Sequence, residues 1–331
     1  DLRPVPLNVP STHSVTSAAR AASVALGRGA PRSARARDVR ERAIRGSLVA
    51  CATLSVVTTF AILGILLVET GQFLSMPEVS VTEFLTGTTW APLLGGKGQF
   101  GVWPLVCGTL LVTAIAAAFA LPVGLVTAIY LSEYARPRVR ATVKPVLEVL
   151  AGIPTVVYGF FALSVITPFL HDHVSERFST FNALGAGLAV GIMILPIVAS
   201  LSEDALRAVP RGLRDAAAAL GSTRFDTSVK VVVPAALSGI MASWLLAVTR
   251  AIGETMIVAL AAGGMARMTI DPAAEVQTMT AWMVQMFGGD AQATGVEYSS
   301  SYAVAAVLFA ITLGLTMVGN LILRAFREEY D

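Results

Sequence analysis

Charge and cysteine are scarce in this chain. Asp, Glu, Lys and Arg make up 14% of its 331 residues, against about 25% in a typical soluble domain. Two cysteines, Cys51 and Cys107, are too few for a disulfide-rich scaffold. Both lie inside apolar runs, which argues against a metal-binding role. Since 55% of the residues are hydrophobic, the composition indicates a membrane protein.

Motifs that would make the chain an enzyme are also missing. A nucleotide-binding loop needs Gly, four residues, Gly-Lys and then Ser or Thr, but Ala91 and Gly98 occupy the first and last of these positions. Neither His-Glu-x-x-His nor Gly-x-Ser-x-Gly occurs. His171 and His173, with acids nearby, could bind a metal, but no further set of ligands is visible in the sequence. We therefore expect no catalytic residue, no metal and no cofactor, and we expect any ATP to be hydrolysed by another subunit.

Long apolar runs are abundant. A run of about 20 residues crosses the ~30 Å hydrocarbon core of a bilayer as a helix. Such runs occupy residues 47–68, 104–131, 143–168, 184–202, 237–262 and 302–326. Because lipid offers no partners to unpaired backbone groups, these runs predict an all-α membrane protein with six transmembrane helices. Pro122 and Pro154 are expected to bend the second and third helices.

Basic residues lie mainly on one side of these runs. Nine arginines precede the first run, and four and five basic residues lie in the second and fourth connections. The opposite connections contain only Lys97, Arg177 and Arg267. Lys and Arg in short loops stay on the cytoplasmic side, so both termini are expected in the cytoplasm. The chain is therefore predicted to be a multi-pass protein of the cell membrane.

The sequence divides into three parts. Residues 1–46 form a basic segment that we expect to be mostly disordered or held on anionic lipid, with a short interfacial helix over 38–45. Residues 47–326 form the transmembrane domain, which a polar coupling loop at about 203–236 interrupts, and residues 327–331 form a cytoplasmic tail. The arginines of the first segment indicate contact with membrane lipid and not with nucleic acid.

The polar loop contains a helix-turn-helix pattern. Residues 216–220 are strong helix formers, Gly221 can end a helix in a left-handed turn, and the two hydroxyl residues after it can cap the next helix. Such a short element cannot bury a core of its own. Its apolar residues Ala217, Leu220 and Phe225 therefore require a partner surface, which indicates a docking device.

The spacing in this loop resembles the docking loop of ABC importer permeases, which reads Glu-Ala-Ala, three residues, Gly, nine residues, then Ile-x-Leu-Pro. Here Asp215, Ala216 and Ala217 precede Gly221 at that spacing, and Pro234 closes the pattern. Asp replaces the Glu of the family, and valines replace Ile and Leu. The resemblance implies the type I importer permease fold and docking of this loop on a cytoplasmic ATPase subunit.

Two further stretches resemble permease subunits of the phosphate-specific transport system. One is Leu-Ala-Gly-Ile-Pro-Thr-Val-Val-Tyr-Gly-Phe-Phe-Ala-Leu at 150–163, and the other is Arg-Ala-Ile-Gly-Glu-Thr at 250–255. Met256 after the second is similar to the C-type subunit. The resemblance covers about residues 44–327. It implies a permease subunit of an ATP-driven phosphate importer, which pairs with a homologous A-type permease, two ATPase subunits and an extracytoplasmic phosphate-binding protein.

Arg250 and Glu254 lie inside the fifth run, one helical turn apart, so they share a face and can pair. Charges in lipid are costly, and such a pair either lines a water-filled path or ties helices together. In the first interpretation Arg250 attracts a tetrahedral oxyanion, and Glu254 offsets its charge so that the anion is released. The hydroxyl groups assigned to the same path are those of Thr155, Tyr158, Thr249 and Thr255.

Alternatives in other function classes stay open at this point. A permease for sulfate or molybdate would share the docking loop. A proton-coupled secondary transporter would use Glu254 as its proton carrier, although six spans and a docking loop argue against it. A membrane enzyme has the least support, because no nucleophile and base can be paired.

Three local predictions concern the ends of the spans. Lys144 and Glu148 are expected to form a boundary ion pair. The outward connection after the first span, with Phe100 and Trp103 as interface anchors, is expected to contact an extracytoplasmic partner. A further helix, capped by Asp271 and ended by glycines at 288–289, is expected on the outward side, where it lies on the membrane or under a binding protein.

Overall fold

The computed structural model describes residues 31–92, 98–290 and 295–325. The chain forms two compact units, residues 1–64 and 65–331, and each is described by itself. Residues 38–45 are helical as predicted, but they belong to one continuous helix, α2 (Pro31–Leu74), and not to a separate interfacial helix. The segment 1–30 and the tail 327–331, for which we predicted disorder and a cytoplasmic location, lie outside the described residues.

The predicted all-α membrane class is confirmed. Among the described residues, five helical stretches are long and apolar enough to cross a membrane. The first is Val39–Leu74 in α2, and the second, Trp103–Tyr134, combines α4 (Trp103–Ile129) with the π-helical η1 (Tyr130–Tyr134). The third, Thr155–His173, combines α6 (Thr155–Phe161), the π-helical η2 (Ala162–Ile166) and α7 (Thr167–His173). The fourth is α8 (Ala183–Ala208), and the fifth is Val296–Arg324 in α15 (Val296–Ala325). A bent pair of shorter helices, Arg224–Ala235 and Leu237–Ile252, would make six.

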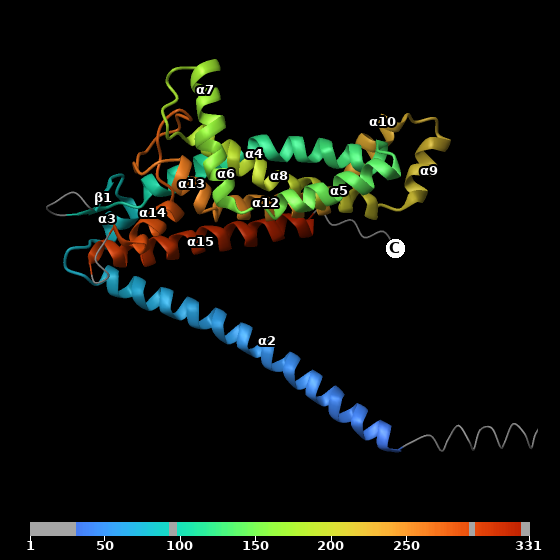
Figure 1. The fold of residues 1–331 in the computed structure, drawn as a ribbon, viewed down its shortest axis with the longest axis horizontal. Coiled ribbons are helices and arrows are strands. Elements are labelled where there is room, and N and C mark those ends of the chain that lie inside the picture. The colour runs from blue at the N-terminus through green and yellow to red at the C-terminus, as the bar shows by residue number, and fades with distance from the viewer. Residues whose placement is uncertain (1–30, 93–97, 291–294, 326–331) are drawn as a thin grey trace, which may run out of the picture. The chain divides into compact units, whose positions relative to one another are not determined.

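Helices α4 and α8 form the centre of the second unit, where they lie side by side (Figure 1). Val112 and Ala116 of α4 and Ile194 of α8 belong to one buried cluster. The two helices approach closely because glycine occupies contact positions: a Cβ atom at Gly187 would lie 2.6 Å from Cγ2 of Ile115. Small residues of this kind allow membrane helices to pack without a hydrophobic driving force.

The third predicted span begins later than expected. Residues 143–151 belong to a separate helix, α5 (Pro137–Ala151), which ends at Gly152, and α6 starts after Pro154. The predicted bend at Pro154 is therefore a break, because proline lacks a backbone N–H and restricts the residue before it. Pro122, in contrast, lies inside α4, which continues through it.

The fifth predicted span is also interrupted. Helix α12 (Leu237–Ile252) has Gly253 as its C-cap, and α13 (Met256–Ala261) begins three residues after this glycine. A continuous helix over 237–262 is therefore wrong. Non-helical backbone inside a membrane protein needs polar partners from the protein itself.

An aromatic cluster fills the end of the second unit that holds α3 (Val81–Thr86) and the two-residue strands β1 (Trp90–Ala91) and β2 (Gln99–Phe100), which pair antiparallel. Its members include Phe73, Phe84, Trp90, Phe100 and Trp282. The rings of Trp90 and Trp282 pack edge to face with centroids 5.2 Å apart. Phe100 is only 5% exposed. It is buried in this cluster, so the predicted partner contact through Phe100 is wrong.

The helix expected to start at Asp271 starts later, as α14 (Met279–Gln285), followed by the π-helical η4 (Met286–Asp290). Its cap is Thr278, whose hydroxyl accepts the backbone N–H of Ala281. Met279 and Met286 are buried in the aromatic cluster. This helix is therefore part of the core and does not lie on a membrane surface.

The α4–α8 contact can be tested at Gly187. In the isolated chain in detergent, Gly187→Ala should lower the free energy of unfolding by roughly 1–3 kcal/mol, because the added methyl group overpacks the contact. Gly314→Ala is the matched control, since a Cβ atom there would have no heavy atom within 4 Å. Denaturant unfolding measures both, and equal effects at the two positions would contradict the packing described here.

Candidate functional site

The predicted docking loop has the geometry that its sequence indicates. Helix α9 (Arg211–Ala219) has Leu220 as its C-cap and is followed by Gly221, whose φ is +80°. The N–H of Ser222 donates to the carbonyl of Ala217 at 3.1 Å, and the N–H of Gly221 donates to the carbonyl of Ala218 at 3.0 Å. This pair of bonds is the Schellman ending, which requires a left-handed residue and therefore favours glycine.

The second arm of the loop starts at once. Thr223 caps α10 (Arg224–Thr227) by accepting the N–H of Asp226 at 3.1 Å. The π-helical η3 (Ser228–Val232) and the short α11 (Val233–Ala235) then lead back to α12. The predicted helix, left-handed turn and capped second helix are thus all present. Figure 1 shows α9 and α10 at the end of the second unit opposite α3 and α14.

Exposure divides the predicted docking residues into two faces. Leu220 is 88% and Phe225 67% exposed, which is unusual for large apolar side chains in one short loop. Asp215, Ala216, Gly221 and Pro234 are exposed as well. Ala217 is buried within the chain, so the expectation that Ala217 needs a partner surface is wrong.

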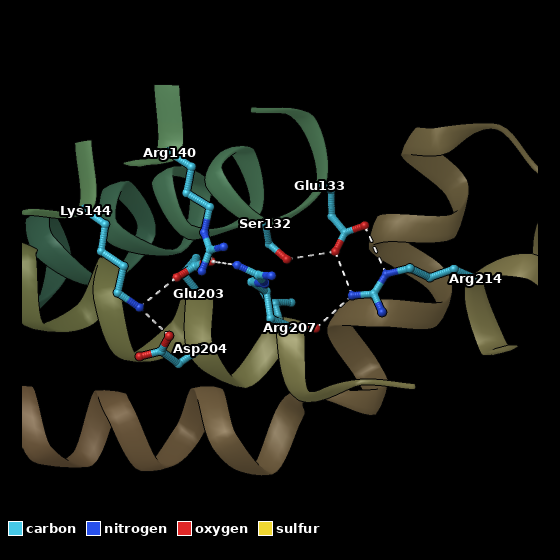
Figure 2. Close-up of polar contacts among 9 residues, drawn as sticks. Ser132, Glu133, Arg140, Lys144, Glu203, Asp204, Arg207 and Arg214 are labelled. Carbon is cyan, nitrogen blue, oxygen red and sulfur yellow. Dashed lines mark hydrogen bonds and ion pairs between the residues drawn. The ribbon is translucent and has the colours of Figure 1, made fainter. Parts of the chain in front are cut away.

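An ion-pair network that the sequence did not indicate lies behind this loop (Figure 2). Arg214 of α9 donates from Nη2 to Oε1 of Glu133 at 2.9 Å and from Nε to Oε2 at 3.3 Å. The same guanidinium donates to the carbonyls of Leu206 and Val209, at 2.8 and 2.7 Å. Ser132 donates to Glu133 as well. Arg214 therefore joins the docking helix to η1 and to the end of α8.

Glu203 of α8 is the centre of a second group in the same region (Figure 2). Its side chain is 1% exposed, and Nε of Arg140 lies 2.7 Å from its Oε1, although this N–H does not point at the oxygen. Lys144 donates to its Oε2 at 3.1 Å and also to Asp204. These contacts fasten α5 to α8.

Lys144 is therefore paired differently from the prediction. Burial would lower the pKa of Lys144, but hydrogen bonds to Asp204 and Glu203 outweigh burial and raise that pKa above 10.5. Glu148, its predicted partner, instead lines a cavity of about 730 Å³ together with Asp215 and Arg214. The break at Gly152–Pro154 explains the error, because α5 turns its charged face to α8.

The predicted pair in the fifth span is present at the helix break. Nη1 of Arg250 lies 3.7 Å from Oε2 of Glu254, with the Arg250 side chain 47% exposed and that of Glu254 2% exposed. Oε1 of Glu254 accepts the N–H groups of Met256 at 3.1 Å and Ile257 at 3.4 Å. The carboxylate therefore caps α13. Buried Thr280 supports the break by donating to the carbonyl of Glu254 at 2.6 Å.

The four predicted hydroxyl groups have different surroundings. Thr249 donates to the carbonyl of Leu245 within α12 at 2.9 Å, and Thr255 donates to that of Gly253 at 3.2 Å. Tyr158 is buried and donates across the α5–α6 break to the carbonyl of Leu150 at 2.8 Å. Thr155, at the start of α6, is half-buried.

Helix α6 packs against α13, because a Cβ atom at Gly159 would lie 2.8 Å from Cδ1 of Leu260. Among the described residues, however, no hydrogen bond joins Thr155 or Tyr158 to Arg250 or Glu254. The structure thus brings together Thr249, Arg250, Glu254 and Thr255 at one helix break. The two residues of α6 belong to the neighbouring helix.

Residues 120–328 match the family described as binding-protein-dependent transport system inner membrane component. The chain belongs to this family. It is 34% identical to the probable ABC transporter permease protein YqgH of Bacillus subtilis over 272 residues, which is 81% of this chain and 87% of that protein. It is 32% identical to the phosphate transport system permease protein PstC of Mesorhizobium japonicum, over 73% of this chain and 78% of that protein.

The fold is also shared with a solved structure. A crystal structure of a bacterial ABC transporter that imports the acidic polysaccharide alginate contains a chain that superposes with a TM-score of 0.61 at 14% identity, over 88% of this chain and 100% of that chain. The predicted resemblance to ABC importer permeases is therefore confirmed in both sequence and fold. The family is one of inner-membrane components, which agrees with the predicted membrane location.

The Glu203 group makes a testable claim about stability. Glu203→Gln would leave Arg140 and Lys144, 28% and 25% exposed, without their shared counter-ion. We expect the free energy of unfolding in detergent to fall by roughly 2–4 kcal/mol, less than for a fully buried pair.

Asp271→Asn is the control, because it breaks an exposed pair with Arg177 and should cost less than about 1 kcal/mol. Denaturant titration of both variants gives the comparison. If Glu203→Gln is as stable as the control, the charges of Arg140 and Lys144 do not need Glu203 as their counter-ion.

Proposed function

We propose that this chain is a permease subunit of an ATP-driven phosphate importer and forms one half of its translocation path. The observation that carries the proposal is the docking turn, in which Leu220 and Phe225 are exposed on a hydrogen-bonded loop at one end of the bundle. A separate ATPase subunit would cover these side chains. The names of relatives such as PstC, a phosphate transport system permease, support phosphate as the cargo.

The complete importer would contain this chain, a homologous A-type permease, two ATPase subunits and an extracytoplasmic phosphate-binding protein. Both termini and the docking loop would face the cytoplasm, as the distribution of basic residues indicates. ATP-driven closure of the two ATPase subunits would draw the docking loops together and open the path outward. Phosphate would enter from the binding protein and leave toward the cytoplasm.

Arg250 and Glu254 suit the transfer of an anion that must not be trapped. The half-exposed guanidinium of Arg250 offers several N–H donors to a tetrahedral oxyanion. The buried carboxylate of Glu254, 3.7 Å from that guanidinium, offsets part of its positive charge, so that a bound anion is released and not trapped.

Arg250→Ala tests the proposal directly. In proteoliposomes that contain the complete complex and its binding protein, we expect uptake of labelled phosphate to fall about 10- to 100-fold, since one charge-assisted contact is lost. Unlabelled sulfate and molybdate should compete only weakly with phosphate in the parent complex.

Arg324→Gln, at the end of α15, is the control and should transport like the parent. Vesicles with the permeases but no ATPase, given a proton gradient, should take up no phosphate. If Arg250→Ala keeps the parent kinetics, the anion path is misplaced. If the proton gradient alone drives uptake, the chain is a secondary transporter.

A further inference from the structure

In the described part of the chain, Arg214 is the one side chain of the docking helix α9 that forms hydrogen bonds to two other helices. It lies on the inward face of α9, beside Leu213, which packs against the buried cluster that contains Leu206 and Val209. The opposite face of the loop carries exposed Leu220 and Phe225. The loop therefore has one face for a partner and another that is fastened to the bundle.

The bonds of Arg214 have a specific geometry. Two of them reach both carboxylate oxygens of Glu133, and a two-point contact between planar groups resists rotation as well as separation. The other two satisfy the carbonyls of Leu206 and Val209 at the end of α8, which have no partner within that helix. The side chains of Arg214 and Glu133 are 21% and 13% exposed, so water competes little for these bonds.

Glu133 connects this junction to the centre of the bundle. It lies in η1, which continues α4, and its neighbour Leu131 is buried. Helix α4 in turn packs on α8 at the glycine contacts described above. Arg214 thus joins the docking helix to the cytoplasmic ends of the two most closely packed helices, and none of its four bonds contributes to the docking turn itself.

We propose that Arg214 and Glu133 are positioning residues that transmit movement of the docking loop to the α4–α8 pair. The inference rests on the proposed function, because it assigns a mechanical role within an ATP-driven importer. Without the bond to Glu133, α9 remains held by the Leu213 contacts and by the short link at 209–210. The loop can then move with the ATPase while α4 stays in place, and ATP is hydrolysed without transport.

The test compares Glu133→Gln, Arg214→Gln and the double variant in the complete complex, with binding protein, in proteoliposomes. Each single variant leaves one partly buried charge unpaired and should lower the thermal midpoint of the complex. The double variant removes both charges, so its thermal midpoint should return toward that of the parent. The number of anions transported per ATP hydrolysed should stay at least tenfold below the parent in all three.

Arg177→Gln is the matched control, because it breaks an Arg–carboxylate pair of similar length, 2.8 Å, that is exposed and remote from the loop. Its transport ratio should equal that of the parent. If the number of anions transported per ATP recovers in the double variant together with its thermal midpoint, or if the double variant fails to assemble, the pair has only a structural role and the proposal is overturned. If the parent complex transports another oxyanion and not phosphate, only the phosphate assignment is refuted. The number of anions transported per ATP is then measured with that oxyanion, and the test of Arg214 and Glu133 still holds.

Discussion

Close contact between α4 and α8 is the constraint on which the rest of the second unit depends. Within a bilayer, apolar side chains gain little by leaving lipid for another helix, so helices must be held by tight packing and by polar bonds. Gly187 allows the tight packing, because a side chain at this position would collide with Ile115. The ion pairs of Glu203 and Glu133 fasten two further helices, α5 and α9, to one end of this helix pair. The docking loop is placed by both.

Two breaks between helices show how the chain satisfies irregular backbone. At the α5–α6 break, the hydroxyl of Tyr158 donates to the carbonyl of Leu150. At the α12–α13 break, the carboxylate of Glu254 accepts two backbone N–H groups, and Thr280 donates to its carbonyl. Each break is supported by side chains of the same protein, as lipid requires. The α12–α13 break leaves the side chain of Arg250 half-exposed. For this reason the break, which has a structural origin, also suits the transfer of an anion.

The parts of the molecule that the sequence predicts well are those decided locally. The turn at Gly221 follows from residues within a few positions of it, because a left-handed residue between a helix and a capping hydroxyl has few other uses. Arg250 and Glu254 pair because they are one turn apart. The apolar runs locate the membrane helices, since lipid imposes their length.

The parts that the sequence does not predict depend on distant partners. Glu133 and Arg214 are separated by 81 residues, and Lys144 and Glu203 by 59, so no spacing rule connects them. Spacing alone therefore pairs Lys144 with the nearest acid in the sequence, Glu148. The start of the third span was missed for a related reason: the apolar run continues across Pro154, while the charged face of α5 finds its counter-ions on α8. Glu254 has a second role as a helix cap, which becomes visible only once the break beside it is known.

The central claim is that the exposed turn is the place where a separate ATPase moves this bundle. A photo-reactive amino acid at position 220, in the complete complex in native membranes, tests it most directly. Illumination should attach the ATPase subunit to this chain, whereas the same group at position 177, in the opposite connection, should not attach it. Attachment of an extracytoplasmic protein at position 220, or labelling of that position by a membrane-impermeant reagent added to intact cells, would contradict the account.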